Sequence, residues 1–370
     1  MKIQALSKIF LYPIAAVYGG ITALRNWLFD KKVMKSVRFD HPIISIGNLS
    51  AGGTGKTPHI EYLIFLLQYV YKVATLSRGY GRKGSGFVMA DVHTSAELIG
   101  DEPRQFKMKF PDTIVTVGED RVLAVPRLLD LRPDTDVILL DDAFQHRAIR
   151  AGLSILLTEY GNLFTRDEVI PLGWLREAKS NYHRADIIIV TKCPHNIGEA
   201  ERAQIIAELK PYKYQKVYFS AIQYGPLYSF INPREWLQLE KDTDVLLLSG
   251  IAKYDALKSY LETKARNVYV REYRDHHRYD RYDLENIRET FGNLGDVKKV
   301  LVTTEKDAAR LEPFRDWFLQ NKIGIFVQPI AITFLHGDAE KFNADIVQYI
   351  EKTKQKIGAT ITDGGFTTEN

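Results

Sequence analysis

The segment from Ile43 to Thr57 constrains the fold of this chain most, because an apolar run, a glycine-rich loop and a helix start follow one another there. The loop ends in Gly-Lys-Thr, which is typical of a phosphate-binding loop between a strand and a helix. Its glycines let backbone N–H groups surround phosphate, Lys56 can reach the β- and γ-phosphates, and the Thr57 hydroxyl can ligate Mg²⁺. Ser50 stands where the usual pattern has glycine. The predicted nucleotide-binding residues are Ser50, Ala51, Gly52, Gly53, Thr54, Gly55, Lys56 and Thr57.

Downstream of this loop, short β-branched runs alternate with amphipathic stretches, which predicts βαβ units. We therefore expect an α/β protein with a P-loop NTPase-like, mostly parallel sheet that carries helices on both faces. The expected strands of this part are 42–46, 72–77, 113–117, 136–140, 153–157, 187–191 and 217–220, and the expected helices are 57–71, 102–110, 120–131 and 198–209.

A chain of 370 residues has room for two domains. A turn-rich stretch at 221–242 interrupts the alternation and is interpreted as a linker. Beyond it we expect strands at 245–249, 268–271, 299–303 and 323–328, and a helix ending near Gln355. The predicted organisation is an N-terminal helix with a basic flank (1–38), a P-loop domain (39–220), the linker (221–242), a smaller C-terminal α/β domain (243–355) and a disordered tail (356–370).

Composition and charge exclude several classes of protein. With 45% hydrophobic and 26% charged residues, the chain is an ordinary globular protein, and its single cysteine, Cys193, excludes a disulfide framework. The first forty residues hold seven Lys and Arg against two Asp, so the other residues sum to −1 of the total +4. Because the basic character is local, we expect no nucleic-acid partner.

The N-terminal segment contains the longest charge-free apolar run, Ile9 to Leu24. It is shorter than the roughly 20 residues that a membrane span needs. Two interpretations remain open. The run forms either a helix buried against the domain or an interfacial helix with Phe10, Tyr12, Trp27 and Phe29 at headgroup depth.

Acidic residues end the apolar run 137–140, at the edge where parallel sheets bind ligands. Asp141 and Asp142 are candidates for the carboxylates that hold Mg²⁺ near a P-loop. Gln145 and His146 follow in the same loop, and His146 could equally cap the next turn.

Two further loops carry charged residues after predicted elements. Arg78 and Arg82 could clamp an anionic substrate, or could form a solvated basic turn. Asp101 could simply favour the start of the helix that follows it.

Arg121, Arg176 and Glu177 lie in other polar loops. The arginines could neutralise a transferring phosphoryl group or form structural salt bridges. His276 and His277 would form an exposed turn if they had no chemical role.

Taken together, these segments resemble the tetraacyldisaccharide 4′-kinase family, which phosphorylates a lipid A precursor. The matching segments follow the order of the family's motifs over nearly the whole chain: GNLSAGGTGKTP (47–58), SRGYGR (77–82), GDEP (100–103), GEDR (118–121), DDAFQH (141–146), PLGWLRE (171–177), DHH (275–277) and TEKDA (304–308).

The resemblance implies a Mg²⁺-dependent enzyme that transfers phosphate from ATP to the 4′-hydroxyl of a tetraacylated glucosamine disaccharide 1-phosphate. The lipid substrate would lie in the inner membrane, with the enzyme at its cytoplasmic face and in peripheral or monotopic contact through the N-terminal helix. The resemblance identifies no protein partner.

The same resemblance implies roles for the polar residues. Asp101 would be the catalytic acid–base residue paired with His276, the doubled histidine leaving His277 as the alternative. Arg121, Asp141 and Asp142 would be the other catalytic residues. Thr57, Asp141, Asp142 and Gln145 would bind metal, and Arg78, Arg82, His146, Arg176 and Glu177 would contact substrate.

Three other functions fit these residues less well. A partitioning-type deviant P-loop ATPase needs a lysine where Ala51 stands, and a GTPase needs an Asp that the segment 191–194 lacks. A non-catalytic nucleotide-binding scaffold at the membrane surface would keep Lys56 but have no use for Asp101.

Overall fold

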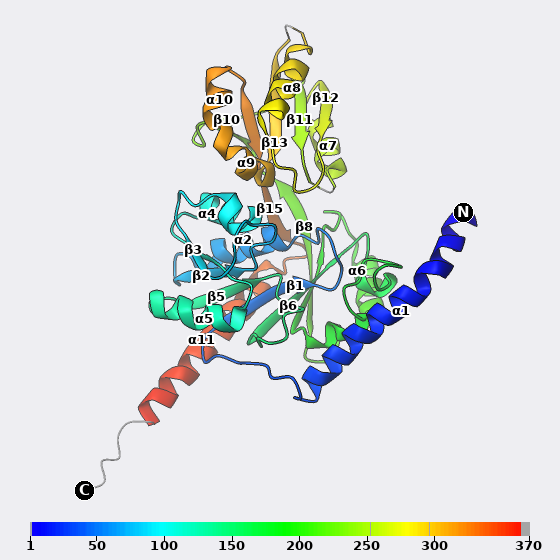
Figure 1. Ribbon diagram of the computed structural model, residues 1–370, viewed down its shortest axis with the longest axis vertical. Helices are drawn as coiled ribbons and strands as arrows, with labels where there is room; N and C mark the ends of the chain where they lie inside the picture. The colour runs from blue at the N-terminus through cyan, green and yellow to red at the C-terminus, as the bar shows by residue number, and fades with distance from the viewer. Residues whose placement is uncertain (1, 252, 296, 364–370) are drawn as a thin grey trace.

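The computed structural model describes residues 2–251, 253–295 and 297–363, which form two α/β units joined by a pair of strands (Figure 1). The larger unit contains a nine-stranded sheet in the order β15-β8-β7-β6-β1-β5-β2-β4-β3. Neighbours from β8 to β4 run parallel, and β15 and β3 pair antiparallel at the two edges. This confirms the expected mostly parallel sheet. Its strands are β1 (Ile43–Asn48), β2 (Val73–Ser77), β3 (Val88–Ala90), β4 (Ile114–Val117), β5 (Val137–Asp141), β6 (Leu153–Glu159), β7 (Ile187–Thr191), β8 (Lys216–Tyr224) and β15 (Ile330–Phe334).

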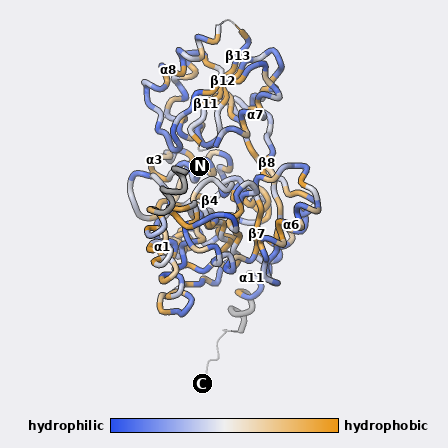
Figure 2. The backbone as a smooth tube through the Cα atoms, turned by 90° about the vertical axis from the view of Figure 1, so that its right-hand side faces the viewer, coloured by the Kyte–Doolittle hydropathy of each residue, from blue (hydrophilic) through white to orange (hydrophobic). Residues whose placement is uncertain are grey.

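Helices cover both faces of this sheet because its central strands are apolar on both sides. In β5, Val137 and Leu139 join the core under α2 and α11, while Ile138 and Leu140 pack against α5 on the other face. Figure 2 shows the hydrophobic residues gathered on the inner strands. The helices of the larger unit are α2 (Lys56–Leu67), α3 (Ala96–Ile99), α4 (Asp101–Lys109), α5 (Arg121–Leu131), α6 (Glu199–Leu209) and α11 (Ala339–Asp363).

The smaller unit contains a six-stranded sheet in the order β10-β9-β14-β13-β11-β12. Strands β14, β13, β11 and β12 are parallel, and β9 and β10 add antiparallel pairs at one edge. Its elements are β9 (Leu227–Ser229), β10 (Trp236–Leu237), β11 (Asp244–Ser249), α7 (Asp255–Glu262), β12 (Asn267–Glu272), α8 (Arg281–Gly292), β13 (Lys299–Thr304), α9 (Glu305–Leu311), α10 (Arg315–Gln320) and β14 (Ile325–Gln328).

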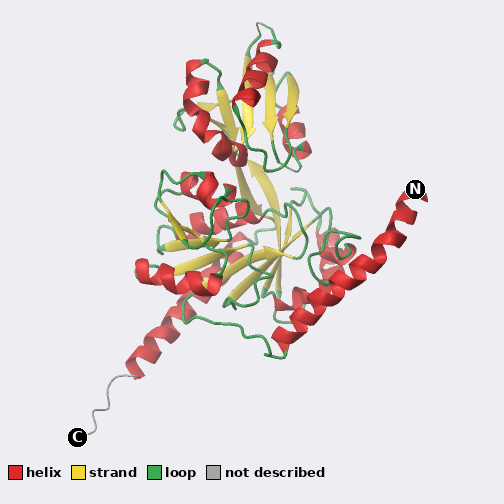
Figure 3. Ribbon diagram, in the orientation of Figure 1, coloured by secondary structure: helices red, strands yellow, loops and turns green. Residues whose placement is uncertain are grey.

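The chain leaves the larger unit through β8 and returns to it through β15, as the paired strands between the units in Figure 3 show. The stretch 221–242, expected to be a linker, therefore contains the end of β8 and the strands β9 and β10. The smaller unit also does not extend to residue 355, because β15 and α11 belong to the larger one. Turn-forming residues mark breaks between elements but do not tell which sheet the next strand joins.

Helix α11 packs its apolar face, Phe342, Ile346 and Ile350, onto the core of the larger unit. It continues to Asp363, whereas the sequence predicted an unstructured tail from residue 356. Residues 364–370 of that tail lie outside the described part of the chain.

The two units touch where α4 meets α9. Lys109 of α4 lies 2.8 Å from a carboxylate oxygen of Glu61 and 2.8 Å from one of Glu305, and both carboxylates are buried. Gln105 donates a second hydrogen bond to Glu61, at 2.7 Å. One lysine thus holds two carboxylates, one from each unit.

Helix α1 (Lys2–Asp30) lies along the side of the larger unit, with its N-terminal end projecting beyond it (Figure 1). Its inner face contacts the loop 167–179 and the loop after β5, through Tyr18 and Asn26. Phe29, which the interfacial interpretation places at headgroup depth, is buried between Arg25 and Arg147.

Candidate active site

The P-loop connects β1 to α2 at the carboxyl edge of the sheet. Gly52 and Gly55 have φ angles of 121° and 88°, a left-handed region that side chains other than glycine rarely adopt. Asn48, at the end of β1, donates to the Thr54 hydroxyl at 2.9 Å, and the Thr191 hydroxyl of β7 donates to the Thr54 carbonyl at 2.9 Å. The loop is therefore fixed to β1, which precedes it, and to β7, as a preformed phosphate site requires.

The two predicted acidic residues stand next to this loop, since Ile46 of β1 pairs with Asp141 of β5. The ammonium of Lys56 lies 3.6 Å from Asp142, and Arg176 binds both oxygens of Asp142 at 2.8 and 3.1 Å. Burial, followed by the charges of Asp142 and Glu102, raises the pKa of Asp141 to about 7. The site thus gathers cations and carboxylates at the position where phosphates would enter.

Two of the residues expected to bind Mg²⁺, Asp141 and Gln145, fit that ion. Among the described residues, Asp141 Oδ1 and Gln145 Oε1 are buried oxygens without a hydrogen-bond partner. Mg²⁺ prefers oxygen ligands and commonly uses one or two carboxylates together with substrate phosphates, so it needs no complete protein cage. No group of three His, Cys, Asp or Glu within the described ranges forms such a cage.

Asp101 and His276 come together from different units. Asp101 begins α4 in the larger unit, and His276 lies in the loop after β12 in the smaller one. The His276 Nδ1 atom is 3.1 Å from Asp101 Oδ2, and the His276 ring lies against Tyr80. The segment 77–82 also meets the smaller unit where Arg278 donates to the Gly81 carbonyl.

The structure also separates the two neighbouring histidines. His277 lies 2.7 Å from Asp283 and stacks on Tyr273, so it holds the loop within the smaller unit. Only His276 of this pair contacts Asp101.

Glu177 occupies a structural position. Its side chain is buried and accepts hydrogen bonds from Arg184, Gln145 and Asn26 at 2.6 to 2.9 Å. It therefore connects helix α1 to the loop that carries Gln145. Direct contact with a substrate is not available to a carboxylate that is enclosed in this way.

Three arginines expected at the site occupy different environments. Arg82 donates to Glu119 and Gly86, and its side chain is only 2% exposed, so it folds its own loop. Arg121 is buried and donates to the carbonyl of Asp141 at 3.4 Å. Of these three arginines, Arg78 is the one that is exposed to solvent.

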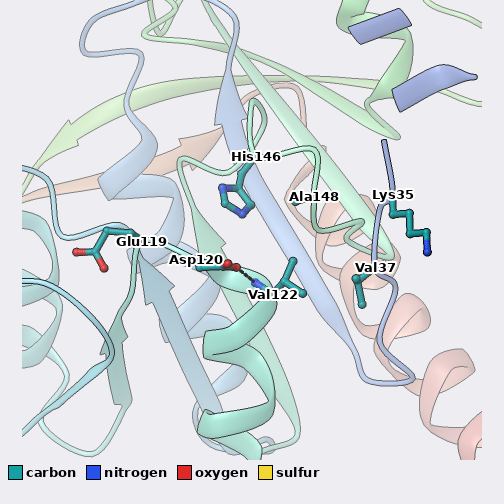
Figure 4. A pocket seen from close by; sticks show the side chains of 7 residues that line it. All are labelled: Lys35, Val37, Glu119, Asp120, Val122, His146 and Ala148. Atoms are coloured by element: carbon teal, nitrogen blue, oxygen red, sulfur yellow. Dashed lines mark hydrogen bonds between the residues drawn. The ribbon is translucent and has the colours of Figure 1, made fainter. Parts of the chain in front are cut away.

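His146 lines a pocket of about 450 Å³ next to the site, together with Lys35, Glu119 and Asp120 (Figure 4). Its Nε2 atom is buried without a partner among the described residues. Burial and the charge of Arg121 lower the pKa of His146, so its ring is neutral at physiological pH.

The outer face of α1 is apolar and exposed. The spacing of its side chains follows the helical repeat, which places them on one stripe. This stripe consists of Phe10, Ile14, Val17, Ile21, Leu24 and Trp27. Among the described helices, none has an apolar stretch sufficient to cross a membrane.

Two residues of the site escaped sequence analysis. Asn48 is fully buried and touches Thr54, Lys56 and Arg176, although nothing distinguishes it from other loop residues in the sequence. Arg310 contacts Asp101 from the smaller unit. Its proximity to the TEKDA segment was the one available signal.

A P-loop at the carboxyl edge of a parallel sheet, beside two acidic residues and an aspartate–histidine pair, defines a P-loop phosphotransferase. Comparison with known proteins narrows this class. The family model described as tetraacyldisaccharide-1-P 4′-kinase matches residues 7–351. The chain belongs to this family. It is an ATP-dependent kinase that phosphorylates the 4′ position of the lipid A precursor tetraacyldisaccharide 1-phosphate.

Individual relatives agree with this assignment. The chain is 42% identical to tetraacyldisaccharide 4′-kinase of Phocaeicola vulgatus, covering 94% of this chain and 96% of that protein. It is 44% identical to the Flavobacterium johnsoniae enzyme of the same name, covering 92% and 97%. A crystal structure of LpxK from Aquifex aeolicus in complex with ATP has a TM-score of 0.69 and 25% identity, covering 92% of this chain and 98% of that one.

Proposed function

We propose that Asp101 accepts the proton of the 4′-hydroxyl while the γ-phosphoryl group of ATP is transferred, and that His276 orients Asp101. The observation that carries this proposal is the 3.1 Å contact between the two side chains at the junction of the units. A sugar hydroxyl must lose its proton as phosphate transfers, and an oriented carboxylate within hydrogen-bond reach can take it.

The remaining polar residues then act on the nucleotide. Lys56 and the backbone of residues 50–57 bind its phosphates, and Arg121 supplies positive charge behind Asp141. Thr57, Asp141, Asp142 and Gln145 would hold Mg²⁺, which when bound neutralises charge on the phosphates. Burial raises the pKa of Asp142, but the charge of Lys56 and the hydrogen bonds from Arg176 outweigh it and lower the pKa, and Arg176 holds Asp142 in place beside Lys56.

The substrate would approach from the side where α1 lies. Arg78 and His146 remain the open candidates for contact with its headgroup, whereas Arg82 and Glu177 act indirectly by holding their loops. We place the enzyme at the cytoplasmic face of the inner membrane, in peripheral contact through the apolar stripe of α1. The acyl chains of the substrate lie in a bilayer, so an enzyme that acts on the headgroup gains from staying at that surface.

The test is an incubation with ATP, Mg²⁺ and a monophosphorylated acyl-disaccharide, read by mass for one added phosphate. We expect Asp101→Asn and His276→Ala each to lower kcat roughly 100-fold or more, with little change in KM for ATP. The double variant should be hardly slower than the worse single variant, because the two residues act as a unit.

The matched control is His336→Ala, since His336 is also exposed and also has a positive φ, 55° against 59° for His276. It should keep wild-type turnover. The acid–base pair would be refuted if the double variant lost the full product of the two single losses in kcat. Near wild-type turnover of Asp101→Asn would refute it as well.

A further inference from the structure

The side chain closest to Asp101 is an arginine of the smaller unit that the mechanism above does not use. Arg310, on α9, places Nε 2.8 Å and Nη2 2.7 Å from Asp101 Oδ2. Its side chain is only 4% exposed. A planar guanidinium that donates twice to one carboxylate is a strong, oriented interaction.

Arg310 is itself held rigidly by the smaller unit. Its Nη1 donates to Asp307 at 3.0 Å and to the Gly250 carbonyl at 2.9 Å. Asp307 is fully buried and also accepts from the Thr304 hydroxyl at 2.8 Å and the Gly250 N–H at 3.0 Å. The orientation of the guanidinium is therefore set by contacts within the smaller unit, independently of Asp101.

The two carboxylate oxygens of Asp101 differ in their hydrogen bonding. Arg310 and His276 both contact Oδ2, and in the described part of the chain Oδ1 has no hydrogen bond. One oxygen is thus anchored and the other is left for a substrate hydroxyl. A base anchored through one oxygen presents the other in a defined direction, which is the positioning that phosphoryl transfer requires.

We propose that Arg310 is a positioning residue, which orients Asp101 through Oδ2. This inference rests on the proposed role of Asp101 as the proton acceptor. Since Arg310 belongs to the smaller unit, the base is correctly oriented only while α9 is docked against α4.

The charges around Asp101 agree with this role. Burial raises the pKa of Asp101, but the His276 hydrogen bond and the charge of Arg310 outweigh it and lower the pKa to about 2. Lys306 of α9 lowers it further, while Lys306 also pairs with Glu102 and faces Asp275. Without Arg310 the effect of burial would be less opposed, so the pKa of Asp101 would rise.

The experiment measures kcat, KM for ATP and the pH dependence of kcat in Arg310→Gln and Arg310→Lys. The matched control is Arg288→Gln, because Arg288 is an exposed arginine of the same unit that pairs with Glu285 and Asn321, away from Asp101. Asp101→Asn and the double variant Asp101→Asn/Arg310→Gln complete the set. Thermal melts are recorded for each protein.

We expect Arg310→Gln to lower kcat roughly 10- to 100-fold with KM for ATP within about twofold. Any acid-side loss of kcat that Asp101 causes should move to higher pH, because its pKa rises from about 2. Arg310→Lys should keep the wild-type pH dependence, because it keeps the charge, but lose several-fold in kcat because it lacks the planar fork. In a protein that already carries Asp101→Asn, adding Arg310→Gln should lower kcat by less than about twofold.

A wild-type kcat and pH profile in Arg310→Gln would overturn the inference. If Arg310→Gln does not fold, the inference is tested by Arg310→Lys alone. A wild-type kcat in Arg310→Lys would mean that the planar guanidinium has no role. The proposed function fails separately, through an active Asp101→Asn protein. A slow Asp101→Asn with an unaffected Arg310→Gln would therefore refute only the role of Arg310.

Discussion

Asn48 lies at the centre of the phosphate site because three groups meet on its side chain. Its amide donates to Thr54, and its oxygen accepts from Lys56 and Arg176. The position and direction of Lys56 are therefore defined by neighbours that are themselves fixed. A lysine held in this way meets incoming phosphates with little loss of conformational freedom.

At this scale we predict that Lys56→Ala lowers kcat by at least about 100-fold and leaves the fold intact. The ammonium acts on the phosphates, whereas Asp142 keeps its two hydrogen bonds to Arg176 when Lys56 is removed. Turnover and a thermal melt check both parts. Lys258→Ala, at an exposed lysine of α7, serves as the control. A variant with unchanged melting and near wild-type turnover would contradict the P-loop assignment.

Single residues were the hardest part to predict from the sequence. Lys56, Asp141 and Asp142 were expected in one site because each belongs to a local pattern of strand, loop and charge. Arg310 and Asn48 carry no such pattern, since their importance comes from contacts between segments far apart in the chain. The expected substrate contact of Arg82 failed for the same reason, because its hydrogen-bond partner Glu119 is 37 positions away in the sequence.

At the scale of elements, α1 has two faces with different partners. Its inner face binds the protein through Tyr18, Asn26 and Phe29, and its outer face is the apolar stripe. The interpretation as a helix packed on the domain is therefore confirmed for the inner face, and the interfacial interpretation stays a prediction for the outer one. Helical periodicity indicates an apolar stripe but not which neighbour covers it.

We predict that replacing Ile14, Val17, Ile21 and Leu24 by serine weakens binding to anionic vesicles on the order of 100-fold or more. Each side chain loses roughly 1 kcal/mol of transfer free energy, and the inner face is untouched. Vesicle co-sedimentation and a thermal melt measure the two effects.

The control for this experiment replaces Phe65, Tyr69 and Val70, which are equally exposed on another surface, by serine. It should bind vesicles as the wild type does. Full retention of binding by the α1 variant, or a large fall in its melting temperature, would count against the interfacial role.

The expected strands are confirmed because each apolar run is local, and most of their bounds agree within one or two residues, whereas β3, β9, β10 and β15 were not predicted. The allocation of elements to the two sheets was not predictable in this way. Residues 330–334, for which no strand was predicted, and the helix after them were assigned to the smaller unit because they follow it in sequence. They form β15 and α11, whose partners are Ser220 to Tyr224 and the core under β1.

At the scale of the molecule, the junction of the two units contains the trio Glu61, Lys109 and Glu305, of which both carboxylates are buried. Two ionised carboxylates against one ammonium leave an uncompensated buried charge. Burial, followed by the charge of Glu305, raises the pKa of Glu61 to about 7. The folded protein therefore takes up a proton here more readily than the unfolded chain does.

We predict from this that the trio makes the protein less stable as pH rises from 5 to 8. A carboxyl whose pKa is raised on folding stabilises the fold below its unfolded pKa of about 4.5 and loses that contribution as pH rises through about 7. The change amounts to at most about 3 kcal/mol. Melting curves of wild type and Glu61→Gln over this range measure it.

Glu61→Gln should be relatively more stable than wild type at pH 8 than at pH 5, because its side chain stays neutral. Glu285→Gln, at an exposed carboxylate, should follow the wild type at every pH. Parallel curves for wild type and Glu61→Gln would show that both carboxylates remain ionised in the folded state throughout.

The return of the chain through β15 also sets the order in which the protein can assemble during its synthesis. A ribosome finishes β8 and must then make residues 225–329 before the partner of its outer edge exists, a delay of about 5 to 20 s at ordinary translation rates. The contacts of β1, the strand before the P-loop, are completed still later, because the Tyr349 hydroxyl that bonds the backbone of Ile43 is made with α11. A nascent chain therefore carries an unpaired strand edge and an uncovered apolar sheet face, the surfaces that chaperones bind, until its nucleotide site can close.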